Sequence, residues 1–498
     1  LEGLRKKEIQ HSLPLALLCG IPVSVQLVFL LVNKTVRHLV IADFVLLLIM
    51  VILSIFVSKK QLAFSRHPLI ANIVGILFLC TTPAMLYLAK GGEEEYASVS
   101  DDSRDYFSQE DLEKYCENPQ ARFDITEHPS NNTNYVISGD QNKSTIYSSI
   151  SNSTYNTLLY DVLRMPISIR NRVAMTADVN PFQEYLMGVR YLQTIKEKVP
   201  AGYSVLQEKD GHVLTENKNV LPLAYGSTAC MYQSDYDQLS YPENLDALVN
   251  RTIIPDASDA FADTVDTKDT ASYHSQMESY QLPENFFIHK IQRKNVTVRR
   301  ELPKTLKAGT ILLLSFDVDY NGTKDISIVI NGIRNRLSGS EAPYPNNNTT
   351  FTYMISSDED MDFLEITFSS GSYRIKNATA YTIPLSAISH PGIVEFKEQK
   401  TKGKQIAAGN ITMPEDGYFV TSYTFSQGYK ALVDGKDVAT VQVNNAFVGF
   451  PLQKGTHEII LEYHAPGKTV GIILSCAALM VLIAWNLLYL LFKHFRKL

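Results

Sequence analysis

The sequence predicts a membrane α-helical protein whose transmembrane helices flank a large extracellular α/β plus β-sandwich ectodomain. Three long apolar stretches near the N-terminus, one more near the C-terminus, and period-two alternation in the polar middle predict this fold class. The average composition conceals it, because 45% hydrophobic residues over 498 positions would also suit an ordinary soluble protein.

Four apolar stretches have the length of membrane spans. A helix needs about 20 apolar residues to cross a hydrocarbon layer ~30 Å thick. The stretches that meet this length are residues 13–32, 39–57, 69–88 and 470–492. The sequence therefore predicts three N-terminal transmembrane helices and one C-terminal transmembrane helix.

Positive charges flank these spans unevenly and predict their orientation. Lys and Arg concentrate on the cytoplasmic side of bilayer helices. Such residues lie before the first span, between the second and third, and after the fourth: Arg5, Lys6, Lys7, Lys59, Lys60, Arg66, Lys493, Arg496 and Lys497. The residues between the third and fourth spans are therefore predicted to lie outside the cell.

The residues before the first span resemble a cytoplasmic loop more than a signal peptide. The charged region, short apolar core and small-residue cleavage site do not occur in the order that a signal peptide requires. We therefore expect further membrane helices to precede Leu1.

Changes in composition divide the chain into seven predicted segments. They are transmembrane helices at 1–90, a stalk at 91–118, a mixed α/β module at 119–250, a polar linker at 251–286, a β-sandwich at 287–390, a membrane-proximal β-sandwich at 391–467, and a C-terminal helix with a cytoplasmic tail at 468–498. The linker is assigned because it is rich in Asp, Ala, Ser and Thr and has few large apolar residues to bury.

Short helices and strands are predicted to alternate in the first part of the ectodomain. Helical patterns cover residues 109–116, 157–163 and 181–188, and strand patterns cover residues 122–125, 189–195 and 213–215. This mixture predicts a small α/β module.

A β-hairpin is predicted at the start of the first sandwich. Apolar side chains alternate with polar ones over residues 314–320, the Asn321-Gly322 pair is a strong turn signal, and residues 326–330 return as a second strand. The last outer segment has the same pattern, with strands at 418–425, 429–433 and 456–463 and a turn at Asp434-Gly435.

The first of these turns also resembles the opening of a calcium-binding loop. Asp317, Asp319 and Asn321 place oxygen atoms at alternate positions, as an EF-hand requires. The twelfth position, which needs a bidentate Glu, is Ile328. The pattern therefore favours the hairpin, and we predict no metal site here.

The five cysteines leave one question open. Cys19, Cys80 and Cys476 lie in apolar spans, whereas Cys116 and Cys230 are predicted to lie outside the cell, where they could form a disulfide. Sequence alone does not determine whether they approach each other. No cysteine or histidine spacing typical of zinc sites occurs.

Polar residues at the outer ends of the N-terminal spans are candidates for binding a phosphate-bearing lipid carrier. They are Arg37, His38, Asp43 and Lys90. Arg and Lys make charge-assisted bonds to phosphate oxygens, and an acidic group inside a membrane span usually faces a cavity or a partner. The alternatives are a snorkelling interface residue for Asp43 and ordinary lipid headgroups as ligands of the cations. A formal net charge of −6 argues against a nucleic-acid partner.

Five short motifs resemble those of one bacterial family. They are YLMGVRY at 185–191, LPLAY at 221–225, GYKALVDGK at 428–436, NNAFVG at 444–449 and KGTHEI at 454–459. Their order, followed by a last transmembrane helix, resembles the YfhO family of bacterial membrane proteins. Tyr429 departs from the Trp that is common at its position.

The resemblance implies a GT-C-like glycosyltransferase, which takes a sugar from a polyprenyl-phosphate carrier and passes it to an acceptor outside the membrane. It also implies an acidic residue in a first outer loop, and a divalent cation as a possible cofactor. No residue of this chain is assigned a catalytic role. Tyr191 and Tyr429, which lie in the shared motifs, are candidate acceptor-binding residues, with a place in a hydrophobic core as the alternative.

The predicted function is the C-terminal portion of a polyprenyl-phosphate-sugar-dependent glycosyltransferase in the bacterial cell membrane. Its expected partners are the lipid-linked sugar, membrane lipids, and a cell-envelope glycopolymer acceptor such as teichoic acid. The alternative is a non-enzymatic, membrane-anchored envelope protein that binds glycan or protein through its β-sandwich ectodomain.

Overall fold

A computed structural model describes residues 106–118, 121–126, 142–144, 152–168, 180–256, 273–287 and 294–495. The chain divides into two compact units, Leu1–Arg104 and Asp105–Leu498, and all the described residues belong to the second unit. The three predicted N-terminal spans, and the residues proposed to bind a lipid carrier, lie outside the described residues.

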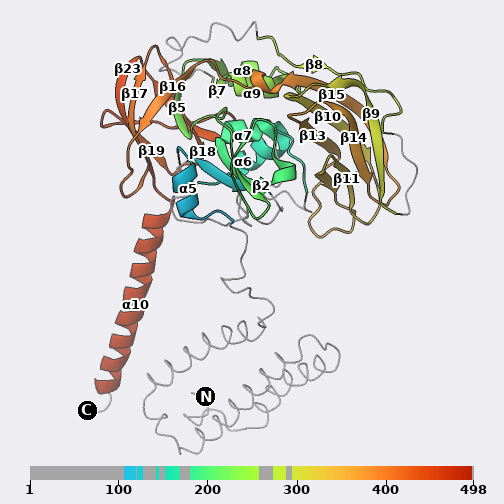
Figure 1. The fold of residues 1–498 in the computed structure, drawn as a ribbon. Coiled ribbons are helices and arrows are strands. Elements are labelled where there is room, and N and C mark those ends of the chain that lie inside the picture. Colours follow the sequence, from blue (N-terminus) through green and yellow to red (C-terminus); the bar gives the residue numbers. More distant parts are fainter. Residues whose placement is uncertain are drawn as a thin grey trace, which may run out of the picture. The chain divides into compact units, whose positions relative to one another are not determined.

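A four-stranded sheet and short helices form the first part of this second unit (Figure 1). The strand order is β1-β2-β4-β3, with β1 parallel to β2 and the other pairs antiparallel. The strands are β1 (Arg122–Ile125), β2 (Val189–Ile195), β3 (Ser204–Lys209) and β4 (His212–Glu216). The helices are α5 (Gln109–Tyr115), α6 (Ser153–Thr157), the π-helical turn η5 (Leu158–Val162), α7 (Pro181–Met187), the 3-10 turn η6 (Lys196–Lys198), α8 (Gln233–Tyr236) and α9 (Glu243–Asn250).

Local sequence explains the bounds of α7. Asn180 caps its first turn, because the Asn180 side chain accepts hydrogen bonds from two backbone N–H groups, and Pro181 occupies the first helical position. Gly188 ends the helix with φ 67°, a left-handed conformation that glycine adopts without strain. A β-carbon there would lie 2.4 Å from the Leu221 carbonyl oxygen, so only glycine fits.

The first β-sandwich consists of two four-stranded sheets with orders β13-β10-β15-β8 and β12-β11-β14-β9. Their strands are β8 (Glu278–Ser279), β9 (Val296–Leu306), β10 (Thr310–Asp319), β11 (Ile326–Ile330), β12 (Ile333–Leu337), β13 (Thr350–Ser356), β14 (Met361–Phe368) and β15 (Arg374–Pro384), and η8 (Leu385–Ala387) follows. One apolar core that includes Phe316, Phe351 and Phe368 joins the two sheets. A strand from the predicted linker, β8, belongs to this sandwich.

The predicted hairpin at Asn321-Gly322 is wrong. β10 pairs with β13 and β15, whereas β11 pairs with β12 and β14 in the opposite sheet, so the segment between β10 and β11 connects two sheets and Asn321-Gly322 does not form a tight turn. The hairpin lies one strand later, at Asn331-Gly332, where φ is 46° and 85°. β10 is buried along most of its length and lies inside its sheet, between the edge strand β13 and β15. Both of its edges are therefore paired, and the next segment in sequence joins the other sheet.

The acidic residues of β10 have protein partners. Asp317 accepts hydrogen bonds from Thr350 (2.7 Å) and Asn377 (2.8 Å), and Asp319 forms an ion pair with Lys376. These contacts connect β10 to its two neighbouring strands.

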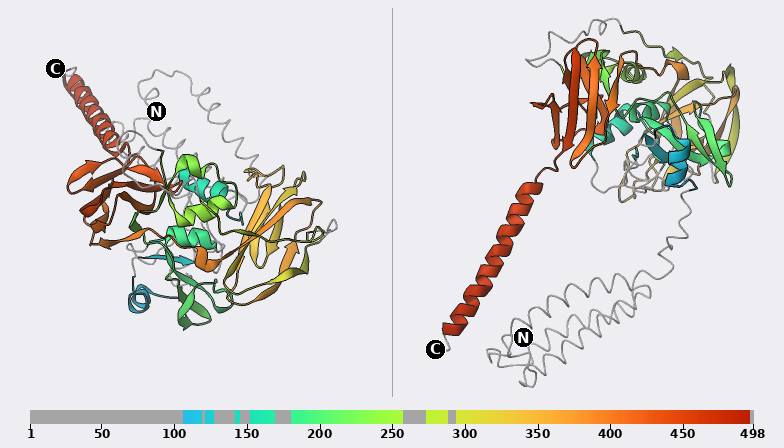
Figure 2. Two further views of the ribbon diagram at one scale, coloured as in Figure 1. Left: turned by 90° about the horizontal axis from the view of Figure 1, so that it is seen from above. Right: turned by 60° about the vertical axis from the view of Figure 1, so that its left-hand side comes forward.

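A nine-stranded sheet of order β20-β19-β23-β17-β16-β5-β18-β22-β21 forms the last part of the ectodomain (Figure 2). Its strands are β5 (Ala224–Ser227), β16 (Ile393–Glu398), β17 (Gln405–Met413), β18 (Gly417–Thr424), β19 (Tyr429–Val433), β20 (Lys436–Val438), β21 (Val441–Val443), β22 (Phe447–Leu452) and β23 (Gly455–Tyr463). A separate two-stranded sheet pairs β6 (Cys230–Tyr232) with β7 (Thr252–Ile254). The Asp434-Gly435 turn between β19 and β20 is confirmed, with φ of 51° and 74°.

β5 places the mixed module inside this sheet. It lies between β16 and β18, although the whole first sandwich separates it from both in sequence, and it pairs antiparallel with each of them. A β-carbon at Gly226 would lie 2.6 Å from the Met413 sulfur and 2.7 Å from Ile411 Cδ1, so glycine lets the core approach. The predicted boundary at residue 250 therefore separates strands that the structure joins.

One helix among the described residues is long and apolar enough to cross a membrane. It is α10 (Lys468–Phe495). Its stretch Lys468–Leu488 has a mean hydropathy of 2.3 and is not buried against the rest of the described protein. Figure 1 draws it as one uninterrupted helix. It coincides with the predicted C-terminal span.

Candidate functional site

Two of the predicted binding residues, Tyr191 and Tyr429, lie in the described part of the chain. The other four, Arg37, His38, Asp43 and Lys90, lie outside it, so their role remains a prediction.

Tyr191 lies on β2 and is buried, with 1% of its surface exposed. Its hydroxyl oxygen accepts a hydrogen bond from the backbone N–H of Asn118 at 3.1 Å. Burial raises the pKa of Tyr191 to about 12. The ring therefore packs inside the module, between β2 and the segment that follows α5, and acceptor binding by Tyr191 stays a prediction.

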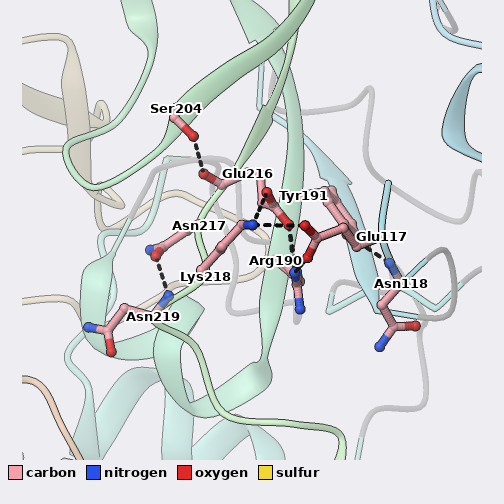
Figure 3. Close-up of polar contacts among 9 residues, drawn as sticks. All are labelled: Glu117, Asn118, Arg190, Tyr191, Ser204, Glu216, Asn217, Lys218 and Asn219. Atoms are coloured by element: carbon pink, nitrogen blue, oxygen red, sulfur yellow. Dashed lines mark hydrogen bonds and ion pairs between the residues drawn. The ribbon is translucent and has the colours of Figure 1, made fainter. Parts of the chain in front are cut away.

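Charged residues surround Tyr191 and pair with one another (Figure 3). Arg190 donates to Glu216 at 2.8 Å and to Glu117 at 2.9 Å, and Lys218 donates to Glu117 at 2.9 Å. The hydrogen bond and charge of Lys218 lower the pKa of Glu117. Two cations face two carboxylates, so the cluster carries no net charge and fixes α5 to the sheet instead of attracting an ion.

Arg122 connects this module to the nine-stranded sheet. Its side chain is buried and donates to the carbonyl oxygens of Met187, Ser422 (3.0 Å) and Lys143 (3.2 Å) and to the Ser422 hydroxyl. Burial lowers the pKa of Arg122. Arg is suited to this place because its planar fork presents five donors to several acceptors at once.

A buried serine and histidine do not form a nucleophilic pair. Ser227 Oγ lies 3.3 Å from His390 Nε2, and the Gly392 N–H donates to His390 Nδ1 at 3.1 Å. Because Nδ1 accepts, the neutral ring carries its proton on Nε2, which therefore donates and cannot take the serine proton. Burial lowers the pKa of His390 to about 3. Ser227, His390 and Thr252 thus form a buried structural network.

The two outer cysteines are free thiols. Cys116 and Cys230 belong to different apolar cores, one around α5 and one around α7 and α9, which explains why they do not pair. Burial raises the pKa of each to about 12. Over the described ranges, no group of three or more His, Cys, Asp or Glu side chains could hold a metal ion.

The ring of Tyr429 packs against the ring of Tyr463, which lies five residues before α10. We call Tyr429 and Tyr463 the aromatic pair. They are opposite each other on β19 and β23, with ring centroids 5.0 Å apart and planes tilted by 58°. Tyr463 is 38% exposed. Gly428 allows the packing, since a β-carbon there would lie 2.6 Å from the Tyr463 ring. The shared motif indicates Tyr429, whereas only the strand register identifies Tyr463 as its partner.

The chain connection limits how far the aromatic pair can lie from the start of α10. Lys468, the first residue of α10, is five residues after Tyr463. A fully extended chain of five residues is about 17 Å long. Next to the pair, His464 Nε2 lies 2.9 Å from Glu462 Oε2, and His464 Nδ1 lies 3.4 Å from Lys404 Nζ. An exposed tyrosine face with polar neighbours can stack against a sugar ring and hydrogen-bond its hydroxyls. The aromatic pair is therefore the candidate acceptor site at the base of α10.

Comparisons with known proteins give one family. A family model described as bacterial membrane protein YfhO matches residues 2–475. The chain is 22% identical over 463 residues to the uncharacterized protein YfhO of Bacillus subtilis (strain 168), covering 88% of this chain and 52% of that protein. It thus spans about half the length of this curated relative.

Solved structures show only distant likeness. A Bacteroides uniformis β-glucuronidase 2 is 13% identical, with 35% of this chain and 22% of that chain covered and a TM-score of 0.13. The mycobacterial arabinofuranosyltransferase AftD is 9% identical, with 58% and 31% covered and a TM-score of 0.13. At a TM-score of 0.13, neither structure identifies the fold or the activity of this chain.

Proposed function

The chain belongs to the YfhO family of bacterial membrane proteins, and from this premise we propose that it is the C-terminal portion of a polyprenyl-phosphate-sugar-dependent glycosyltransferase. It transfers a sugar to a cell-envelope glycopolymer, with teichoic acid as the example we favour. In this proposal α10 and the N-terminal spans cross the membrane, and residues 90–467 lie outside the cell.

The observation that supports this proposal most is the aromatic pair. It presents a partly exposed tyrosine face within about 17 Å of the apolar helix along the chain. A lipid-linked sugar has its phosphate at headgroup depth, so an acceptor bound at this height would meet the donor. Tyr429 and Tyr463 therefore hold the acceptor, and Arg37, His38, Asp43 and Lys90 hold the carrier phosphate.

Catalysis is assigned to residues beyond the described part. Among the described residues no group of three or more His, Cys, Asp or Glu side chains could hold a metal ion, and His390 has the wrong tautomer to take the Ser227 proton. The second candidate function is a non-enzymatic, membrane-anchored envelope protein that binds glycan or protein through its β-sandwich ectodomain. A transfer assay separates the two.

The test uses membranes that carry the whole encoded protein, a radiolabelled polyprenyl-phosphate sugar and purified envelope polymer. Tyr463→Ala should raise the KM for the polymer by about fivefold to tenfold, because it removes a stacking surface. Tyr344→Ala, which truncates a tyrosine that is 73% exposed, is the matched control and should leave KM unchanged.

Tyr429→Trp should keep transfer, because Trp is common at this position in the family that the motif resembles. Absence of any transfer by the unmodified protein, with retained polymer binding, would replace the enzyme by the binding-protein function. Equal KM values for Tyr463→Ala and the unmodified protein would show that the aromatic pair is not part of the acceptor site.

A further inference from the structure

A polar cleft lies between η5 with the segment that follows it and the loop that leads into β13. Its volume is about 270 Å³, and its lining includes Tyr160, Asp161, Arg164, Asn347, Asn348 and Thr350. Small-ligand pockets begin at about 300 Å³, so this cleft is slightly smaller than that range and has room for a ligand of about one ring. None of these residues belongs to the aromatic pair.

Arg164 is held in a defined orientation on one wall. Its guanidinium carbon lies 3.7 Å from the centre of the Tyr241 ring, and this stacking leaves the N–H groups around the rim of the plane. Arg164 has φ 48°, a left-handed conformation that arginine rarely adopts. The hydrogen bond from Met165 N–H to the Leu159 carbonyl (2.9 Å) fixes the backbone beside it.

The opposite wall is a loop built on buried amides. The Asn348 side-chain nitrogen donates to Asn335 Oδ1 at 2.6 Å and to the Arg336 carbonyl at 3.0 Å, so the amide oxygen is the group that Asn348 can present to a ligand. Asn335 Oδ1 also accepts from the Ile167 N–H at 3.0 Å, which ties the two walls together. Asn347, which has φ 51°, is exposed and lines the cleft.

The chemistry of the lining indicates one ligand class. Arg164 and Asp161 bring one positive and one negative charge, and Asn347, Asn348 and Thr350 add neutral donors and acceptors. A cleft with both charges does not favour a phosphate, whose charge would need an excess of cations. Adjacent donors and acceptors match the vicinal hydroxyls of a sugar, each of which both donates and accepts.

We propose that this cleft binds one neutral saccharide unit, with Arg164 donating to sugar oxygens and Asp161 accepting from sugar hydroxyls. Saccharide binding itself would hold for an enzyme and for a binding protein. The further statement that the bound unit is part of the acceptor polymer rests on the proposed function.

Saturation-transfer NMR and titration calorimetry on the full chain test the proposal, in a detergent without a sugar headgroup. The probes are methyl glycosides of glucose, galactose and N-acetylglucosamine, with glycerol phosphate and inorganic phosphate as anionic probes. At least one glycoside should bind, and Arg164→Gln should weaken it about tenfold or more, the effect expected when a hydrogen bond to a charged group is lost. Arg299→Gln is the matched control, because Arg299 also stacks on an aromatic ring (Phe363, 3.3 Å) outside the cleft.

A second variant guards against misfolding. Asn347→Gly keeps the left-handed backbone and removes only the amide, so it should weaken the glycoside by about threefold to tenfold with an unchanged melting temperature. Three results would overturn the proposal: no glycoside binding, unchanged binding in both cleft variants, or preferential binding of the phosphates. Because these assays need no lipid-linked sugar, failure of transfer and failure of the cleft give different results.

Discussion

Single residues join segments that are far apart in sequence. Arg122 lies on β1 yet donates to the backbone and hydroxyl of Ser422 on β18. His390 lies against Ser227 and Thr252 and receives a hydrogen bond at Nδ1 from Gly392. Both are buried polar side chains, and such groups are costly unless every partner is in place.

Replacing Arg122 should destabilise the protein strongly. Arg122→Met leaves buried carbonyl oxygens and the Ser422 hydroxyl without a donor, so the free energy of unfolding should fall by about 3 kcal/mol or more. Denaturant unfolding followed by tyrosine fluorescence measures this change. Arg299→Met, at a side chain that is 59% exposed, should stay within about 0.5 kcal/mol. An equal effect of the two variants would show that Arg122 does not anchor the module.

His390 should make the fold less stable in mild acid. Its pKa is lowered from 6.5 to about 3, chiefly by burial, so below pH 6.5 the unfolded chain binds a proton that the folded chain excludes. This part of the stability is complete above pH 6.5 and is lost as the pH falls toward 3. His390→Gln removes it.

The measurement compares unfolding free energies at about pH 7 and pH 5. The unmodified protein should lose about 2 kcal/mol more than His390→Gln over this interval, at about 1.4 kcal/mol per pKa unit. Other titrating groups contribute equally to both proteins and cancel. Parallel pH profiles would mean that His390 takes up a proton as readily in the folded state as in the unfolded chain.

At the scale of elements, turn type and strand pairing differ in what determines them. Asn331-Gly332 and Asp434-Gly435 both make two-residue hairpins with positive φ. Asn321-Gly322 has the same composition but connects two sheets. Neither Asn321 nor Gly322 has a positive φ or lies in a turn, so the dipeptide alone does not determine a hairpin, and the core decides which strands pair.

Gly332→Ala tests the hairpin that the sequence did not predict. Gly332 has φ 85°, and a β-carbon there would meet no atom within 4 Å, so the cost is backbone strain alone. The free energy of unfolding should fall by about 1–2 kcal/mol. Chemical denaturation measures the change, and an unchanged midpoint would mean that the turn relaxes to another type without cost.

At the scale of the whole molecule, the proposal depends on the side of the membrane that the sheets face. α10 supplies an apolar stretch of 21 residues, and basic residues follow it. From the positive-inside rule we expect the tail to lie in the cytoplasm and the sheets to lie outside the cell.

Cysteine labelling in intact cells tests this topology. Lys436→Cys, in the exposed turn of β20, should react with a membrane-impermeant maleimide, whereas Lys497→Cys should react only after permeabilisation. The unmodified chain gives the background, which should be low because Cys116 and Cys230 are buried. The reverse pattern would place the sheets in the cytoplasm and would contradict the proposed function as a glycosyltransferase that acts outside the cell.

The sequence by itself determined the local elements and the family. Periodicity and capping residues predicted β1, α7, β2, β19 and the apolar run of α10, because these depend on neighbours along the chain. The motifs predicted the YfhO family, which the comparisons confirm. They also singled out Tyr429.

Only the tertiary structure decided which segments meet. The sheet order that places β5 between β16 and β18, the pairing of Tyr463 with Tyr429, and the cleft that joins Arg164 to Asn347 all bring distant residues together. No local pattern encodes these contacts. They arise because each apolar face is buried against whichever element completes the core, and such a choice depends on all the elements at once.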